Sequence, residues 1–598
     1  MPNLITKSLY VDYHESNKLA WWKINNLQTY KFIKWIEDEE EWEDLNVKLG
    51  QKVEDVVGEY LFRKFWTKRT NVFEEVKFSE NVDEEQEDII LTTYKNGIDS
   101  NIKRTEEAIK QRVPIIYQAW FIYNGLFCRV DYLVLNSNWN YDLIEVKAKT
   151  WVRKDRTYKK VPNKWAWNLE DVYLADISFQ KYVITKVFEE KGLWILENKY
   201  FAYLNNKYVR DWVLEIEKLI VLDRVDCINE ILLIWEDDDK KENRDDSLQH
   251  FTWIEELVKT LEIDINLSEE EFNSKYPFSW SKYLTYFWKD KPFWTIYWKW
   301  LTHNCVWALH QLWKVNLEDL CDEEVCMFNK ADWTVWTARK FVDNYLLCKT
   351  NRTCIIEKWD IKWELNNLNY PLCFYDYETV SVPIPFLDKT SPYQQVVVQY
   401  SLHKVYENWD IKHYSWILAG TWEQKIELLE IKDNKNKVDF ENEKLIYWDY
   451  KDVLMALKDD IWEDIDRSSF IVWHKPFENT RNKEVAQIFP ELGDFYLKMN
   501  DNTYDLKEIF SKWLYFSLDF KGSCSIKYVL PALVPELSYV WMNVPNWLVA
   551  MNELNRIIIW EVKDDNEKLQ KLTDLLLYCW QDSLAMFKIY EKVLSVLK

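Results

Sequence analysis

Glycine is scarce in this chain, which has 8 glycines among 598 residues but 36 tryptophans. Glycine normally makes up about 7% of a protein, because turns and helix ends need residues that accept a positive φ. Several tryptophans directly follow an asparagine or aspartate, where a turn normally has glycine, among them Trp139, Trp333, Trp409 and Trp547. We therefore hypothesise that many of the tryptophans are UGA codons that the source organism reads as glycine. The alternative, a tryptophan-lined platform for sugars or bases, does not explain why glycine is missing from turns.

Long apolar runs and a secretory signal are also missing. No run reaches the roughly 18 apolar residues that a membrane helix needs. The first residues, MPNLITKSLYVDYHES, lack a basic region followed by an apolar core. The 10 cysteines are scattered, as expected for reduced thiols in a cytosol. The sequence therefore predicts a cytoplasmic protein without a membrane segment.

An excess of basic charge is missing as well, because 77 Lys and Arg stand against 100 Asp and Glu, a net charge of −23. This balance excludes a globally basic surface, so any binding of nucleic acid must rest on local patches. Hydrophobic residues make up 48% of the chain and charged residues 30%. These shares indicate a folded globular protein and exclude disordered, collagen-like and disulfide-stapled classes.

Strand and helix patterns predict an α/β protein in three segments. Residues 1–262 begin with charged helical patterns and continue with short strands that alternate with helices. Residues 263–366 have the pattern of a helical connecting region. Residues 367–598 open with the strand CFYDYETV and alternate between strands and helices, as in a domain with a central sheet.

The first group of candidate residues lies in the segment CRVDYLVLNSNWNYDLIEVKAKT, which predicts a hairpin with a polar turn at 136–140. A turn centred on Asn138 places Asp131 opposite Glu145, with their Cβ atoms about 5 Å apart. Lys147 projects from the same face as Glu145. Two acids and a lysine on one face can hold Mg²⁺ and direct a water at a phosphodiester. A basic stretch follows, KAKTWVRKDRTYKK. A solvent-exposed charged hairpin is the alternative interpretation.

These motifs resemble those of PD-(D/E)xK nucleases of the RecB-like branch, in the order Asp131, Glu145-x-Lys147 and Gln180-x-Tyr182. The resemblance implies a restriction-endonuclease-like α/β domain over about residues 1–260. It also implies that both acids bind metal, that Lys147 helps to activate water and that Gln180 supports the site. The Gln-to-Tyr spacing is shorter than in the family. Glu59 stands where the family's upstream acidic motif is expected.

Many members of that branch bind an iron–sulfur cluster through one early and three later cysteines. The early position in this chain reads HESNK, without cysteine. Five later cysteines are present: Cys305, Cys321, Cys326, Cys348 and Cys354. We interpret them as ordinary thiols and do not expect an iron–sulfur cluster.

A second group of candidates is spread over the C-terminal segment. Asp376 and Glu378 lie two residues apart on an apolar strand and therefore point to one face. His474 and Glu478 follow a second strand, at the expected start of a helix. Near the C-terminus, LLLYCWQDSLAMFKIYEKVL predicts an amphipathic helix that stacks Tyr578 on Asp582, four residues later. Four acids and a tyrosine fit a phosphodiesterase with two metal ions, although each motif alone is common on protein surfaces.

In this order the motifs resemble the DEDD exonucleases of the ribonuclease-H-like fold, tyrosine subtype. Asp376 and Glu378 match the first motif, His474-x-x-Phe477-Glu478 the second, and Tyr578-x3-Asp582 the third. Asp505 matches an accessory acid. The resemblance implies that the four acids bind Mg²⁺ or Mn²⁺ and that Tyr578 orients the attacking water. The family normally has aspartate where this chain has Glu478, which puts full activity in doubt.

Three stretches of sequence resemble an uncharacterised bacterial family that fuses a RecB-like nuclease to this exonuclease-like domain: SPYQQVVVQYSLH, FKGSCSIKYVLPALVPELSY and YCWQDSLAM. The resemblance to this family covers nearly the whole chain. Four tryptophans stand where that family usually has glycine or a small residue: Trp473, Trp513, Trp541 and Trp547. The resemblance implies a metal-dependent nuclease with two sites, the C-terminal one a 3′–5′ exonuclease. DNA is favoured over RNA as the substrate. The competing interpretation is a scaffold that binds nucleic acid on nuclease folds and has lost catalysis.

Overall fold

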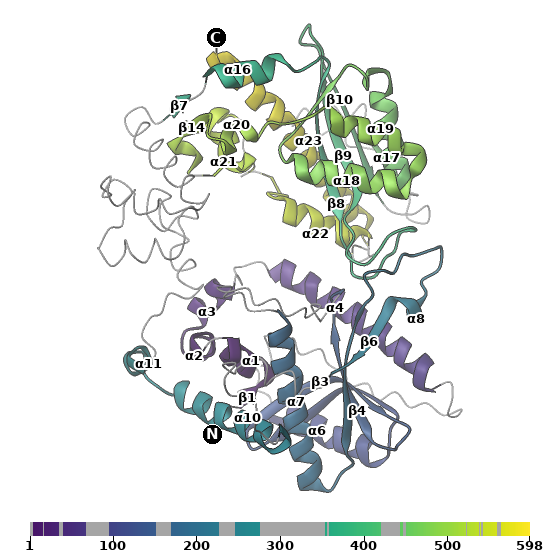
Figure 1. Cartoon of the computed structure of the whole chain (residues 1–598), viewed down its shortest axis with the longest axis vertical. Coiled ribbons are helices and arrows are strands. Elements are labelled where there is room, and N and C mark those ends of the chain that lie inside the picture. Colours follow the sequence, from purple (N-terminus) through teal and green to yellow (C-terminus); the bar gives the residue numbers. More distant parts are fainter. Residues whose placement is uncertain are drawn as a thin grey trace. The chain divides into compact units, whose positions relative to one another are not determined.

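The computed structural model describes residues 4–66, 95–150, 169–225, 246–275, 353–419 and 443–597, apart from short gaps inside these ranges. The chain divides into two compact units, Met1–Ser279 with Pro383–Tyr393, and Trp280–Val382 with Gln394–Lys598. Each unit contains a mixed sheet covered by helices (Figure 1), which confirms the prediction of an α/β protein. Most of the expected helical connecting region lies outside the described residues, so the boundaries at 262 and 366 stay predictions. None of the described helices is both long and apolar enough to cross a membrane.

The sheet of the first unit has six strands: β1 (Ile5–Thr6), β2 (Ile115–Tyr123), β3 (Leu126–Leu135), β4 (Tyr141–Lys147), β5 (Leu196–Leu204) and β6 (Ile220–Arg224). The order is β1-β3-β4-β5-β6, and β2 pairs with β3. Its helical segments are α1 (Lys7–Glu15), α2 (Asn17–Asn25), α3 (Leu27–Lys34), α4 (Glu40–Leu61), a π-helix (Phe62–Trp66), α6 (Lys95–Lys110), α7 (Leu169–Lys191), α8 (Ile216–Leu219), α10 (Asp246–Asp264) and α11 (Glu269–Lys275).

The two faces of this sheet pack against different helices. On one face, Leu133 and Leu143 join a core with α1, α6, α7 and α10. On the other face, Val134 and Ile144 pack with α4 and α8. Because side chains alternate along a strand, Asp131, Glu145 and Lys147 belong to the same face as Leu133 and Leu143, which α7 covers.

The larger sheet of the second unit has six strands: β8 (Leu372–Val380), β9 (Val396–Val405), β10 (Ile411–Leu418), β11 (Glu443–Ile446), β12 (Ser469–Val472) and β13 (Thr503–Asp505). The order is β11-β10-β9-β8-β12-β13, which places β8 inside the sheet. A two-stranded sheet pairs β7 (Thr353–Ile355) with β14 (Tyr515–Ser517).

Helices of the second unit are α16 (Lys358–Asn366), α17 (Tyr450–Ile461), α18 (Lys475–Ile488), α19 (Pro490–Asp501), α20 (Glu508–Ser511), α21 (Ile526–Leu533), α22 (Trp547–Ile558) and α23 (Asp565–Leu597), with 3₁₀ turns at Trp462–Asp464 and Leu518–Phe520. The long helix α23 packs along β8 and β9. Phe374 of β8 contacts Phe587 and Tyr590 of α23, each at a ring distance of 5.6 Å. These contacts fix α23 over the face of β8 that carries Asp376 and Glu378.

Several tryptophans have a backbone conformation that suits glycine. Four of the ten described non-glycine residues with a positive φ are tryptophans: Trp139 (63°), Trp212 (58°), Trp409 (68°) and Trp513 (58°). Residues other than glycine rarely adopt this region. Trp139, Trp409 and Trp513 therefore have the positive φ expected from the sequence, while the recoding itself stays a hypothesis. Trp473 and Trp547 do not have a positive φ, and Trp333 and Trp541 lie outside the described residues.

Candidate metal-binding sites

The first candidate site is built on the predicted hairpin. β3 and β4 are antiparallel, and a turn at residues 136–140 joins them. The register pairs Tyr132 with Ile144. Continued by one residue, this register sets Asp131 opposite Glu145, as the sequence predicts. The backbone N–H of Val146 donates a 2.7 Å hydrogen bond to Oδ2 of Asp131 and so fixes that carboxylate against β4.

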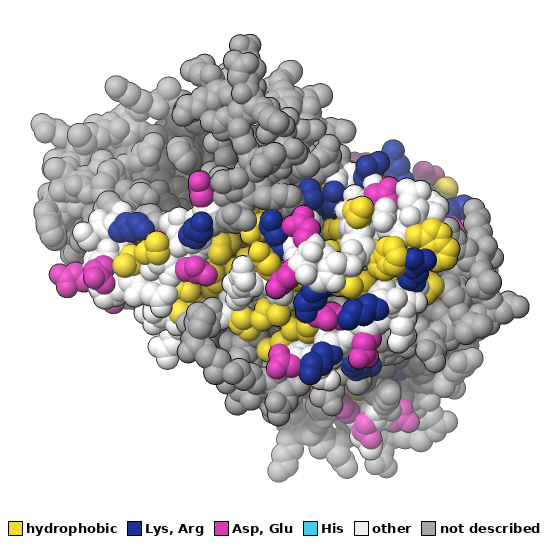
Figure 2. Space-filling view, turned by 90° about the horizontal axis from the view of Figure 1, so that it is seen from below, with side chains coloured by type: hydrophobic (Ala, Val, Ile, Leu, Met, Phe, Trp, Pro, Cys, Tyr) yellow, Lys and Arg dark blue, Asp and Glu magenta, His cyan; other side chains and the backbone are white. Residues whose placement is uncertain are grey.

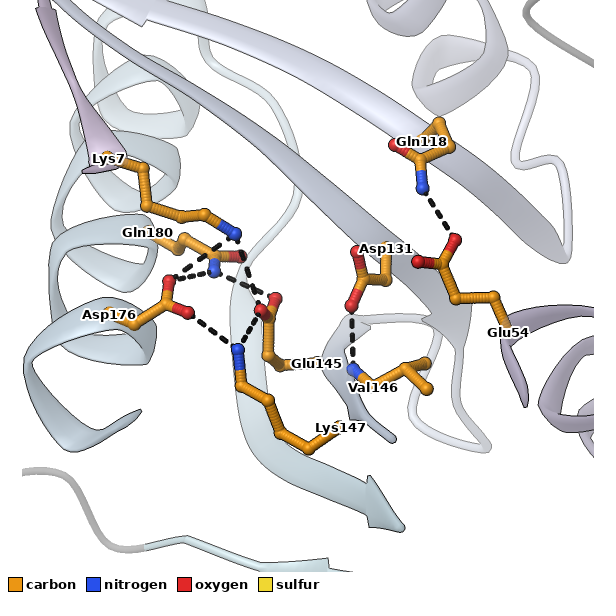
Figure 3. A network of polar contacts seen from close by, with 9 residues as sticks. All are labelled: Lys7, Glu54, Gln118, Asp131, Glu145, Val146, Lys147, Asp176 and Gln180. Carbon is orange, nitrogen blue, oxygen red and sulfur yellow. Dashed lines mark hydrogen bonds and ion pairs between the residues drawn. The ribbon is translucent and has the colours of Figure 1, made fainter. Parts of the chain in front are cut away.

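The buried Glu145 is the centre of a polar network (Figure 3). Its Oε1 accepts hydrogen bonds from Nζ of Lys147 at 2.7 Å and from Nζ of Lys7 at 3.3 Å. Its Oε2 accepts from Nε2 of Gln180 at 2.8 Å. The structure thus gathers Asp131, Glu145, Lys147 and Gln180 in one place, although their catalytic roles remain predictions.

Asp176 of α7 completes this network, and the sequence analysis missed it. Its Oδ2 lies 2.8 Å from Nζ of Lys147, and its Oδ1 accepts from Nε2 of Gln180 at 2.6 Å. Burial alone would lower the pKa of Lys147, but Asp176 and Glu145 together raise it above its usual value. The two carboxylates therefore keep Lys147 charged. Asp176 precedes Gln180 by one helical turn, and this i, i+4 spacing was the signal that could have found it.

Glu54 of α4, rather than Glu59, lies within electrostatic reach of Asp131 and Glu145. Oε2 of Glu54 accepts hydrogen bonds from the Tyr117 hydroxyl and from Nε2 of Gln118, each at 2.9 Å. Burial raises the pKa of Asp131 well above its usual value, and Glu145 and Glu54 raise it further, so these three carboxylates lie within electrostatic reach of one another. The side chain of Glu59 is 49% exposed and pairs with Arg63 on the surface of α4. The expectation for Glu59 is therefore wrong, since a residue five positions away on the helix points in a different direction.

The second candidate site lies between β8 and α23. Ligand atoms of Asp376, Glu378 and Cys579 all lie within 4.8 Å of one another. Asp376 is partly exposed and Glu378 is buried. Burial raises the pKa of Asp376 well above its usual value, and the charges of Asp582, Glu378 and Glu478 raise it further. Asp376 is therefore within electrostatic reach of the other three acids predicted from the sequence.

Two tyrosines flank Asp582 on α23. Tyr578 is buried one turn earlier on the helix, and it lowers the pKa of Asp582 through a side-chain hydrogen bond. Tyr539 donates a hydrogen bond to Oδ1 of Asp582. Burial outweighs both hydrogen bonds and raises the pKa of Asp582 to about 6. Neither Tyr539 nor Cys579 was singled out in the sequence, because neither belongs to a motif with recognisable spacing.

Glu478 lies in the first turn of α18, which begins at Lys475 with a proline next to it. Glu478 is buried, and its Oε2 has no hydrogen-bond partner among the described residues. Burial raises its pKa to about 8, and Asp505 contributes in the same direction. His474 stands before the helix as an exposed residue, and no hydrogen bond or ion pair is recorded between it and the described acids. The structure therefore brings Glu478 within electrostatic reach of Asp376, whereas His474 interacts electrostatically with the accessory acid Asp505.

The donors of both sites suit hard divalent cations. Mg²⁺ and Mn²⁺ prefer carboxylate oxygens, and carboxylates close to one another repel unless a cation reduces the repulsion. The residues present therefore fit the ions implied by the resemblance. The basic stretch after Lys147 continues beyond the described residues. Four of the cysteines considered for an iron–sulfur cluster also lie outside them: Cys305, Cys321, Cys326 and Cys348. On the described part of the face in Figure 2, Lys and Arg side chains are interspersed with acids. Positive charge on that part therefore occurs in small groups of side chains and does not form one broad basic surface.

Comparison with known proteins yields relatives without an assigned activity. Residues 373–525 match the family described as "Domain of unknown function (DUF2779)". The chain is similar to "Uncharacterized protein UU173" of Ureaplasma parvum, with 27% identity over 36% of this chain and 30% of that protein. It is also similar to "Uncharacterized protein MG366 homolog" of Mycoplasma pneumoniae, with 28% identity over 36% of this chain and 31% of that protein. The matches thus span about a third of the length of these relatives. No solved structure matches.

Proposed function

We propose that the chain is a metal-dependent nuclease with two phosphodiesterase sites. The observation that carries the proposal is the convergence of carboxylates from separate elements onto one place in each unit. In the second unit, the charges that raise the pKa of Asp376 come from Asp582, Glu378 and Glu478, on α23, β8 and α18. Such repulsion has a cost in a fold and is relieved when a cation binds between the acids.

In the first unit, Asp131, Glu145 and Glu54 are the residues that would hold the ion. A bound Mg²⁺ or Mn²⁺ supplies a water of lowered pKa and stabilises charge on the phosphoryl oxygens. Lys147 stays protonated beside Glu145 and is suited to contact a phosphate or the attacking water. Gln180 donates to Glu145 and holds that carboxylate in one orientation.

In the second unit, Asp376, Glu378, Glu478 and Asp582 would hold the ions, and the Tyr578 hydroxyl lies close enough to Asp582 to orient a water there. The raised pKa of Glu478 favours the protonated acid below about pH 8. A cation held by Glu478 would have to displace that proton. From the resemblance we propose 3′–5′ exonuclease action at this site, with DNA preferred over RNA, in the cytoplasm.

One specific feature favours the competing candidate, a scaffold that binds nucleic acid without cleaving it. Glu478 takes the place of the family's aspartate and is one methylene longer, which displaces its carboxylate from the position of the aspartate, and metal coordination tolerates little displacement. The scaffold predicts retained DNA affinity without cation-dependent chemistry.

Calorimetric titration with Mg²⁺ and Mn²⁺ distinguishes the two candidates. We expect the wild-type chain to bind both ions, and we expect Asp131→Asn and Asp376→Asn each to remove one class of binding site. Asp142→Asn is a matched control, because Asp142 is a buried acid of β4 whose Oδ1 bonds to Asn136 and Asn198 instead. A wild-type chain that binds DNA but neither ion supports the scaffold and contradicts the nuclease.

A further inference from the structure

Two lysines share the carboxylate that the first site needs for its cation. Oε1 of Glu145 lies 2.7 Å from Nζ of Lys147 and 3.3 Å from Nζ of Lys7. Lys7 is the first residue of α1, directly after β1, whose pairing with β3 fixes the start of the helix. Figure 3 shows both ammonium groups next to Glu145, whereas Asp131 and Glu54 lie to the other side of it.

A divalent cation on Glu145 competes with these ammonium groups. Like charges at such distances repel strongly in a partly buried site, so at least one lysine must leave Oε1 when the ion binds. Asp176 provides a second acceptor for both lysines. Its Oδ1 lies 3.5 Å from Nζ of Lys7 and its Oδ2 lies 2.8 Å from Nζ of Lys147.

Asp176 is suited to this role because it is fixed in place. It is 6% exposed, and Nε2 of Gln180 donates to its Oδ1 as well as to Oε2 of Glu145. The single amide group thereby ties the two carboxylates together. A lysine that moves from Glu145 to Asp176 crosses a short distance and stays beside the site.

We propose that Asp176 is a positioning residue that takes over Lys7 and Lys147 from Glu145 when a divalent cation binds. Lys7 then has two functions: it balances the charge of Glu145 before the ion binds, and it provides a second ammonium group for the scissile phosphate afterwards. This inference rests on the proposed function, because it requires that Glu145 binds the ion.

The test is Mn²⁺ affinity, measured by calorimetry on the full-length chain with Asp376→Asn and Asp582→Asn as the parent, so that binding reports the first site. Lys7→Met removes a competitor of the ion and should tighten Mn²⁺ binding by roughly tenfold. Asp176→Asn leaves both lysines on Glu145 and should weaken binding by a similar factor. In the double variant, the effect of Asp176→Asn should shrink, because one of the two lysines is already gone.

Asp12→Asn is the matched control, because Asp12 is a buried acid of α1 that pairs with Lys23 and Tyr30 outside this network. Its Mn²⁺ affinity should equal that of the parent. If Lys7→Met leaves affinity unchanged or weakens it, the transfer of the lysines is refuted while the metal site stands. If Asp176→Asn has its full effect in both backgrounds, Asp176 is itself a ligand and the proposal is wrong. A parent that binds no Mn²⁺ refutes the proposed function for this site, and the inference with it.

Discussion

At the scale of single residues, the four tryptophans at positive φ combine a large side chain with a backbone conformation that has little room for one. A non-glycine residue costs about 1–2 kcal/mol in the left-handed region. Trp212 is the clearest case, because its φ is 58° and its side chain is 81% exposed, so little packing compensates for the strain. This is the conformation expected if the source organism reads these codons as glycine.

Trp212→Gly should therefore raise the free energy of unfolding by about 1 kcal/mol. The matched control is Trp363→Gly, since Trp363 is 70% exposed but lies inside the helix α16. There glycine should lower the free energy of unfolding by about 0.5 kcal/mol. Urea unfolding of both variants measures the two effects. Destabilisation by Trp212→Gly would argue against the recoding hypothesis, as would tryptophan at this position in peptides of the native protein.

Glu478 should make stability depend on pH. Burial raises its pKa in the folded chain to about 8, from an ordinary value of 4.5, so the folded state binds the proton more tightly than the unfolded state. The stabilisation is fully present below about pH 4.5 and is lost as the pH rises towards about 8. Without divalent ions, the free energy of unfolding of the wild-type chain should therefore fall across this window. The free energy of unfolding of the Glu478→Gln variant should fall less over the same pH range. The exposed Glu463, changed to glutamine, serves as a control that keeps the wild-type slope. Identical slopes in wild type and Glu478→Gln would contradict the assignment.

At the scale of secondary-structure elements, the sequence predicted the features that depend only on neighbouring residues, which are the hairpin and the faces on which side chains lie. The polar run at 136–140 between two apolar runs located the hairpin, and the period of two along β3 and β4 placed Asp131 opposite Glu145. The same period placed Asp376 and Glu378 on one face of β8, and the spacing of four placed Tyr578 one turn from Asp582 on α23.

Contacts between distant elements were not predictable in this way. Lys7 reaches Glu145 across 138 residues of sequence, and Tyr539 reaches Asp582 across 43. No local period encodes such contacts, since they depend on how helices pack on the sheets. The expectation for Glu59 failed for the same reason, because only the packing of α4 decides which of its acids faces the sheet.

At the scale of the whole molecule, each of two compact units carries its own group of converging acids. The two groups of acids differ in the lysine side chains that lie near them. Lys7 and Lys147 form ion pairs with Glu145 in the first unit. In the second unit, burial and Asp582 raise the pKa of Glu378, and Lys527 offsets only part of this rise. We therefore propose that the two units have independent phosphodiesterase sites, and we expect that loss of one site leaves the other intact.

The most direct test is cleavage of end-labelled single- and double-stranded DNA and RNA with Mn²⁺, using chains made with tryptophan and with glycine at the positive-φ positions. We expect Asp376→Ala to abolish stepwise shortening from the 3′ end and to leave cleavage that depends on Lys147. Lys147→Ala should have the reverse effect, and the double variant should be inactive. Two results would contradict the proposal that these two groups of acids are catalytic sites. One is full cleavage by both single variants and by the double variant, and the other is no cleavage by any wild-type preparation that binds Mn²⁺.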